Sequence, residues 1–363
     1  MKIAFYGSSL VSSYWNGAAT YYRGMLKSLA MKGYDITFYE PDVYDRQKHR
    51  DIEPPDWCKV VVYEGSIGAL RRVAACARDA DIVVKASGVG FEDDVLMSQL
   101  LENARPDAMK IFWDVDAPAT LAELKEAPDH PLRRSLGCFD MVLTYGGGDP
   151  VVATYRDLGA KDCVPIYNAL DPETHHPVDR QDVFAADLAF LGNRLPDRED
   201  RVRQFFFEPT SKVPGRRFVL GGSGWSDKTM TPNVRYIGHV GTEQHNAFNV
   251  TPMAVLNISR SSMAETGFSP ATRVFEAAGA GACLITDDWR GIDLFLKPGE
   301  EILVARDGHD VAELLDGLTR EKAEAIGRKA LARVLAEHTY AHRAELADRL
   351  FRTWKEARKE VAA

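Results

Sequence analysis

The sequence has 363 residues, long enough for two α/β domains with a buried core each. Its 45% hydrophobic and 27% charged residues are typical of a globular protein, and it contains no apolar run of the roughly 18 residues needed to span a membrane. The net charge of −8 argues against nucleic acid as the main partner, because phosphate binding needs a basic surface, but a local basic patch could still contact a membrane.

The first residues and the cysteines indicate the compartment. The start "MKIAFYGSSL" lacks the basic flank and long apolar stretch of a signal peptide. The five cysteines are odd in number and form no CxxC pair, which favours reduced thiols over disulfides or a structural zinc site. We therefore expect a cytoplasmic protein.

The N-terminal half predicts strands that alternate with helices. A buried strand at "KIAFYG" precedes a helix from about Gly17, whose apolar residues recur at helical spacing up to Gly33, a plausible C-terminal stop. Further strands are predicted at "DITFYE", "DIVVKAS", "KIFWDVD" and "FDMVLTYG", and a helix at "EDDVLMSQLLENA". This order is typical of a doubly wound parallel sheet.

A second α/β domain is predicted after the Pro- and Asp-rich stretch "DPETHHPVDRQDVF". Its strands are "ADLAFLGN", "RFVLGGSG", "VRYIG", "AVLNIS" and "ACLITD". The tail carries an apolar helical face of Leu346, Leu350, Phe351 and Trp354 that must dock on another element. We expect an N-terminal domain at residues 1–178, a C-terminal domain at 179–338 and a helix at 339–363 that packs back on the first domain.

The segment "TGFSPATRVFEAAGAGACLITDDW" is small and apolar except for Arg273 and Glu276. Ser269 is a good N-cap, so we expect a helix from Pro270 to about Ala280, with the two charged residues together on one side. One interpretation is a surface ion pair. The other is a nucleotide clamp, in which the helix N-terminus and the guanidinium hold a diphosphate and the carboxylate accepts hydrogen bonds from a ribose.

Several motifs, in this order along nearly the whole chain, resemble the CgeB-like glycosyltransferases, which are related to the GT-B enzymes of family 4. They are "WDVDAPATL", "FDMVLTYGGG", "ALDPETHHP", "DLAFLGNRLPDRE", "LNISRSSM", "GFSPATRVFEAAGAGACLITDDWRGID" and "AEHTYAHR". The resemblance implies a GT-B fold of two Rossmann-like domains that face a cleft. It also implies a nucleotide-sugar donor on the C-terminal domain, an acceptor on the N-terminal side and a crossover helix at the C-terminus.

Donor-binding residues follow from this resemblance. Family 4 enzymes carry two glutamates separated by seven residues. Glu276 matches the second, whereas Phe268 stands where the first is expected, and the nearest upstream glutamate is Glu265. The backbone of Gly267, Phe268 and Ser269 would face the donor.

The other expected site residues lie at strand ends and in one loop. At the carboxyl ends of strands, Gly192, Asn193, Arg194 and Arg260 would approach the diphosphate together with Arg273. In the loop "SSYWNGAATYYR", Gly17 would approach the donor phosphates, whereas Trp15 and Asn16 would face the acceptor. The alternatives are ordinary turns, a solvated arginine at Arg260 and a packed aromatic at Trp15.

Asp114 and Asp116 form a weak match to the metal-binding aspartates of the GT-A fold. Because the tandem architecture indicates GT-B, whose enzymes usually work without bound metal, we expect no metal and no other cofactor. We interpret the two aspartates as a base or acceptor ligands, or as a cap of the next helix. The lone His175, His176 and His239 lack the spacing of a zinc site.

The resemblance therefore implies a retaining glycosyltransferase of cell-surface or glycoconjugate biosynthesis, which acts on a glycan, lipid or protein. Two alternatives remain: a nucleotide-sugar epimerase of the same fold, and a non-catalytic nucleotide-sugar-binding protein. Nicotinamide chemistry is disfavoured, because "GSSLVSS" lacks the GxGxxG fingerprint.

Overall fold

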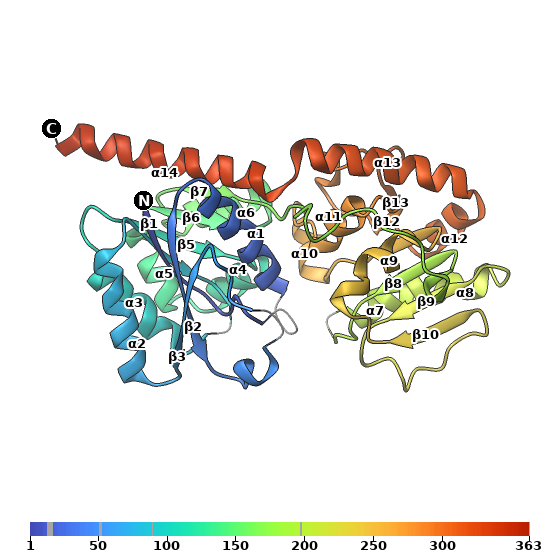
Figure 1. The fold of residues 1–363 in the computed structure, drawn as a ribbon, viewed down its shortest axis with the longest axis horizontal. Coiled ribbons are helices and arrows are strands. Elements are labelled where there is room, and N and C mark those ends of the chain that lie inside the picture. Colours follow the sequence, from blue (N-terminus) through green and yellow to red (C-terminus); the bar gives the residue numbers. More distant parts are fainter. Residues whose placement is uncertain (13–16, 51–52, 89, 197, 363) are drawn as a thin grey trace. The chain divides into compact units, whose positions relative to one another are not determined.

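The computed structural model describes residues 1–12, 17–50, 53–88, 90–196 and 198–362 (Figure 1). The chain divides into two compact units, which we describe separately. The first consists of residues 1–168 and 340–363, and the second of residues 169–339. The boundary thus falls ten residues before the one expected at 178, just ahead of the stretch at 171–184 that the sequence suggested as a linker.

The first unit is built on a parallel sheet. In the described residues it has seven strands in the order β3-β2-β1-β4-β5-β6-β7. They are β1 (Lys2–Tyr6), β2 (Asp35–Asp42), β3 (Lys59–Glu64), β4 (Ile82–Ala86), β5 (Met109–Asp114), β6 (Met141–Thr144) and β7 (Cys163–Pro165). The helices are α1 (Gly17–Met31), α2 (Ile67–Ala74), α3 (Asp93–Asn103), α4 (Ala117–Glu126), α5 (Pro131–Ser135), α6 (Gly148–Asp157) and α14 (Tyr340–Ala362).

Successive side chains of β1 pack on opposite faces of this sheet. Tyr6 belongs to an apolar cluster with residues of α2 and α3, whereas Phe5 stacks on Phe38 at 5.2 Å between ring centroids and packs edge-on against Tyr22 of α1. Helix α1 ends where the sequence predicts. Gly33 has φ of +87°, and its N–H donates to the carbonyl of Ala30 at 2.8 Å, so glycine there allows the turn that stops the helix.

Helix α14 packs along α1 of the first unit (Figure 1). The hydroxyl of Tyr34 donates to Asp348 at 2.7 Å, and the ring of Phe351 lies edge-on against Tyr34. Of the predicted apolar face, Phe351 is buried as expected, whereas Leu346, Leu350 and Trp354 are only half-buried. Ala344 and Ala347 are fully buried instead. The two alanines let the helices approach closely.

The second unit repeats the architecture. In its described residues the parallel sheet has six strands in the order β10-β9-β8-β11-β12-β13. They are β8 (Leu188–Leu191), β9 (Phe218–Gly221), β10 (Val234–Gly238), β11 (Ala254–Asn257), β12 (Leu284–Asp287) and β13 (Leu303–Ala305). The helices are α7 (Glu199–Val202), α8 (Glu208–Lys212), α9 (His245–Val250), α10 (Ser261–Thr266), α11 (Thr272–Gly279), α12 (Gly308–Asp316) and α13 (Arg320–Glu337).

Both sheets reverse their winding beside their first strand, between β1 and β4 in the first unit and between β8 and β11 in the second. In open α/β sheets, ligands bind outside the carboxyl ends of the strands at such a switch point. The carboxyl edge of each sheet is therefore the place to search for a site. In the described part of the chain, no helix is both long and apolar enough to cross a membrane.

Candidate functional site

The loop before α11 has an unusual backbone. Gly267 has φ of +74° and ψ of −177°, and a Cβ there would lie 2.8 Å from the carbonyl oxygen of Arg290. Phe268 has φ of +50°, and its N–H donates to the same carbonyl at 2.7 Å. Its ring lies under the Arg290 guanidinium, 5.0 Å from the cation. The loop is thus fixed against the segment that follows β12, in a conformation that only glycine adopts easily at 267.

The N-terminus of α11 differs from the prediction. The helix begins at Thr272, and its N-cap is Ala271 with extended φ and ψ of −64° and 153°, not Ser269. The Ser269 hydroxyl instead donates to the carbonyl of Gly267 at 3.0 Å, and the residue is buried. The prediction of Ser269 as the N-cap was wrong, because its hydroxyl hydrogen-bonds to the Gly267 carbonyl within the loop. The first N–H groups of α11 therefore have no side-chain cap.

Arg273 and Glu276 lie one turn apart on α11, and both are half-buried. Among the described residues, neither side chain makes a hydrogen bond or an ion pair, so the expected surface ion pair is not formed, although the two charges still attract each other. Burial lowers the pKa of Arg273, and the nearby Glu276 carboxylate opposes this shift only in part. A desolvated cation without a partner is costly, and a bound anion would relieve that cost.

His245 joins this pair, although the sequence analysis did not single it out. It is the first residue of α9, a helix that packs against α11. Its pKa is lowered by burial and by the positive charge of Arg273, while the Glu276 carboxylate acts in the opposite direction. No motif marks His245, because only the packing of two helices brings it to Arg273.

A buried ion pair supports the ends of β11 and β12. Asp287 is fully buried and accepts hydrogen bonds from Arg201, at 2.5 Å, and from the N–H and hydroxyl of Ser259, at 3.0 and 3.1 Å. Burial raises the pKa of Asp287, and the Arg201 charge opposes the shift. Arg260 directly follows Ser259 and is the N-cap residue of α10. It therefore lies next to the end of β11 that these hydrogen bonds hold in place.

The residues after β8 are tied to the loop after β9. The Gly192 carbonyl accepts from the indole of Trp225 at 2.7 Å, and the Asn193 side chain accepts from the N–H of Ser223 at 2.8 Å. The Arg194 guanidinium pairs with two carboxylates, Glu199 at 2.6 Å and Asp227 at 3.0 Å. These contacts give Asn193 and Arg194 a structural role, and their part in diphosphate binding stays a prediction.

In the first unit, Asp114 is completely buried at the end of β5. Its carboxylate accepts hydrogen bonds from the hydroxyls of Ser87, Thr120 and Tyr155 and from the N–H of Asp116. Burial raises the pKa of Asp114, while these donors oppose the shift. A fully buried carboxylate with four donors favours a role in fixing the surrounding loops, and a part as base or acceptor ligand stays a prediction.

The remaining predicted residues of the first unit are Asp116, Trp15, Asn16 and Gly17. Asp116 is the N-cap residue of α4, but its side chain makes no capping hydrogen bond. Gly17 is the first residue of α1, and Trp15 and Asn16 lie outside the described residues. Within the described ranges, no group of three or more His, Cys, Asp or Glu side chains is arranged to hold a metal ion.

Comparisons with known proteins agree with this architecture. Residues 198–348 match a family model described as glycosyl transferase-like. No curated protein sequence matches the chain. A sucrose-phosphate synthase structure from Thermosynechococcus elongatus is similar, with 13% identity, a TM-score of 0.71 and coverage of 98% of this chain and 100% of that one.

Two ligand complexes are also similar. Anabaena HepE with UDP and glucose has 12% identity and a TM-score of 0.68, and the match covers 97% of this chain and 100% of that one. An α-glucosyltransferase with UDP and a 13-mer DNA has 12% identity and a TM-score of 0.69, with coverage of 97% and 99%. The fold of this chain is therefore GT-B, with its two parallel α/β units.

Proposed function

We propose that the chain is a glycosyltransferase that moves a sugar from a nucleotide-sugar donor to an acceptor hydroxyl. The observation that carries the proposal is the pair of half-buried, unpartnered charges on α11, Arg273 and Glu276. They lie in the segment that matches the glycosyl transferase-like family, and Glu276 occupies the position of the ribose-binding glutamate in the resemblance described above.

The two charges suit the two ends of a nucleoside diphosphate. The uncapped N-terminus of α11 offers N–H donors and a positive dipole end to phosphate oxygens, and Arg273, the second residue of the helix, adds a guanidinium. Glu276 lies one turn further, where a carboxylate accepts hydrogen bonds from two ribose hydroxyls. Arg260 is proposed as a second cation for the diphosphate.

The proposed reaction breaks the bond between the sugar C1 and the diphosphate oxygen, which leaves with the electron pair. The acceptor oxygen then bonds to C1, and its proton passes to the departing phosphate oxygen. Arg273 stabilises the charge that grows on this oxygen, so its contribution is electrostatic. Attack on the same face of the sugar, with retention, is part of this proposal because the resemblance to the family 4 enzymes implies it.

The finer assignments belong to the same proposal. We infer a CgeB-like enzyme that works in the cytoplasm without a metal and acts in glycoconjugate or cell-surface synthesis, and the motifs quoted above support this inference. The HepE and α-glucosyltransferase complexes contain UDP, so UDP is the first nucleotide to test.

The test is calorimetric titration with UDP, other nucleoside diphosphates and the nucleosides alone. We expect one diphosphate to bind, and a Glu276→Ala variant to bind it more weakly. No binding of any diphosphate would overturn the proposal. Incubation with the donor alone separates the epimerase, which converts the sugar, from a transferase, which at most hydrolyses the donor slowly.

A further inference from the structure

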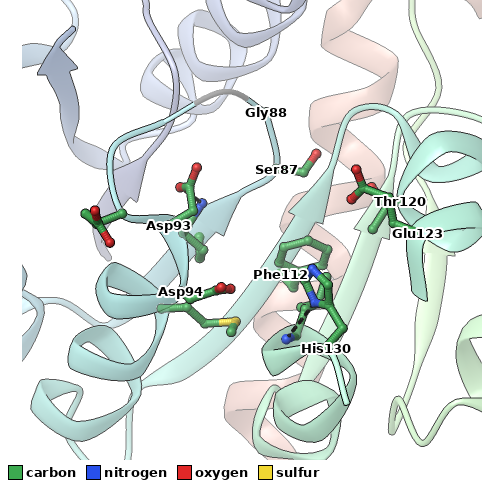
Figure 2. A pocket seen from close by; sticks show the side chains of 12 residues that line it. Ser87, Gly88, Asp93, Asp94, Phe112, Thr120, Glu123 and His130 are labelled. Carbon is green, nitrogen blue, oxygen red and sulfur yellow. Dashed lines mark hydrogen bonds and ion pairs between the residues drawn. The ribbon is translucent and has the colours of Figure 1, made fainter. Parts of the chain in front are cut away.

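The first unit contains an open cavity of about 330 Å³ at the carboxyl ends of β4 and β5, within the usual size range of ligand pockets (Figure 2). Figure 2 shows it between α3, which carries Asp94, and α4, which carries Glu123 and Thr120. Apolar side chains of Met97, Phe112 and Leu132 also line it, and these residues are buried.

The polar groups of this cavity are mainly hydrogen-bond acceptors. Asp94 and Glu123 lie on opposite sides, both exposed, and among the described residues neither carboxylate has a partner (Figure 2). The Thr120 hydroxyl donates its proton to the buried Asp114 at 3.1 Å, so its lone pairs remain for a ligand.

The donors that line the cavity are largely occupied. The Lys85 ammonium pairs with Asp93 at 2.6 Å and donates to the Ala86 carbonyl at 2.7 Å, so its charge is neutralised within the wall. The Nδ1 of His130 accepts from the N–H of Leu132 at 3.2 Å, which leaves a single donor at Nε2 of the neutral ring. The cavity therefore favours a ligand that is rich in donors and positively charged.

We propose that this cavity binds an acceptor that carries a protonated primary amine, such as an amino sugar, whose ammonium pairs with the carboxylates of Asp94 and Glu123 that line it, at one side or the other. The proposal rests on the proposed glycosyltransferase function, because only a transferase has an acceptor, and it names the chemical class of that acceptor. An ammonium supplies three donors and one positive charge, which match two carboxylates and the Thr120 hydroxyl. The ring packs on the apolar floor around Phe112, and a hydroxyl of the same molecule, not the amine, takes the sugar.

The charge balance disfavours an anionic ligand. The Lys85 and Asp93 charges cancel, and the exposed carboxylates of Glu92, Asp94 and Glu123 stay uncompensated around the cavity. A phosphate or carboxylate would meet repulsion there, and a neutral sugar could donate hydrogen bonds to the carboxylates but would bring no positive charge to balance them. The proposed pocket thus selects by charge.

The test compares glucosamine, N-acetylglucosamine and glucuronic acid by ligand-observed NMR titration of the whole chain, at a pH below the amine's pKa. The three share a ring and differ in charge. We expect glucosamine to bind about tenfold more tightly than N-acetylglucosamine, from one charge-assisted contact, and glucuronic acid to bind most weakly.

Asp94→Asn combined with Glu123→Gln removes both charges and keeps the side-chain shapes. We expect this variant to lose the preference for glucosamine, whereas the control Glu102→Gln, an exposed position on the same α3 outside the cavity, keeps it. Equal binding of the charged and acetylated sugars, no sugar binding, or a preference that survives in the double variant would each overturn the proposal.

A separate titration with UDP keeps the two proposals distinguishable. Loss of glucosamine selectivity with intact UDP binding rejects the amine pocket alone. Glucosamine selectivity without any nucleotide binding rejects the transferase and leaves an amine-binding cavity.

Discussion

The carboxyl edges of the two sheets treat buried charge differently. In the first unit, Asp114 has four donors and Lys85 has an acidic partner, so the charges deep in the edge are satisfied by the protein itself. In the second, Asp287 is satisfied in the same way, but Arg273 and Glu276 are half-buried and unpaired. The comparison teaches that a saturated buried charge holds the fold, whereas a desolvated charge without a partner is the candidate for contact with a ligand.

The largest expected effect is on stability, at a buried charge that already has protein partners. Asp287→Ala leaves Arg201 and Ser259 without their partner, so we expect the free energy of unfolding to fall by about 3–5 kcal/mol. Asp310→Ala, which breaks the ion pair with the exposed Arg306, should cost no more than about 1 kcal/mol. Denaturant titration measures both, and equal losses would contradict the distinction.

Arg273→Ala tests the other kind of charge, which is half-buried and has no ion-pair partner among the described residues. We expect single-turnover sugar transfer, or donor hydrolysis, to slow by about a hundredfold, by analogy with the loss of one preorganised donor, whereas the free energy of unfolding should not fall. Lysine should rescue only partly, because a point charge cannot make the two-pronged contact of a guanidinium. As a matched control, Arg194→Ala removes a guanidinium that already pairs with Glu199 and Asp227.

If Arg194 is structural, its variant retains nearly full activity per folded molecule. Wild-type rates in a folded Arg273→Ala protein would instead remove Arg273 from the mechanism, and a large loss in Arg194→Ala would return Arg194 to the diphosphate site.

Glu276→Gln sharpens the ribose assignment. The amide keeps the shape but loses the charge, so nucleoside diphosphate affinity should fall by about tenfold or somewhat more, as for one charge-assisted hydrogen bond. The melting temperature without ligand should change little, since Glu276 has no protein partner among the described residues. Calorimetric titration measures the affinity, and an unchanged value would reject the ribose contact.

A smaller effect is expected from pH. Burial and the positive charge of Arg273 lower the pKa of His245 in the folded protein. The contribution of neutral His245 to the free energy of unfolding is therefore fully present above the pKa of an unfolded histidine, and it is lost as the pH falls from there through the lower pKa of the folded state. A bound diphosphate would offset the Arg273 charge and raise this pKa, so binding takes up a proton and diphosphate affinity should increase as pH falls. The increase should be less than about tenfold. It should disappear in His245→Gln, and an identical pH profile in both proteins would exclude the coupling.

Removal of divalent metal ions is expected to leave the rate of sugar transfer unchanged. Following the metal-free proposal, transfer should persist after dialysis against EDTA. Loss of turnover that manganese restores would require a metal on the donor diphosphate and a new assignment of its ligands.

Periodicity along the chain was sufficient for the fold class, because each strand and helix buries a face that its own residues define. The stop of α1 at Gly33 and the strand ends at Asp114 and Asp287 follow from local pattern alone. The start of α11 does not, because the Ser269 hydroxyl has a choice of local partners and bonds to Gly267 rather than to the helix. The buried face of α14 was predicted only in part: Phe351 is buried as expected, but hydrophobicity marks the large side chains whereas close helix packing also selects the alanines.

For the site, the sequence by itself determined which charged residues interrupt a buried segment, and so it found Arg273 and Glu276. Only the tertiary structure decided which charges are satisfied. It placed the partners of Asp114 and Arg194 around them, brought His245 of α9 to Arg273, and formed the cavity with Asp94 and Glu123 on facing helices. The physical reason is that a charge is neutralised by neighbours in space, and in this protein many of those neighbours are 30 or more residues away along the chain.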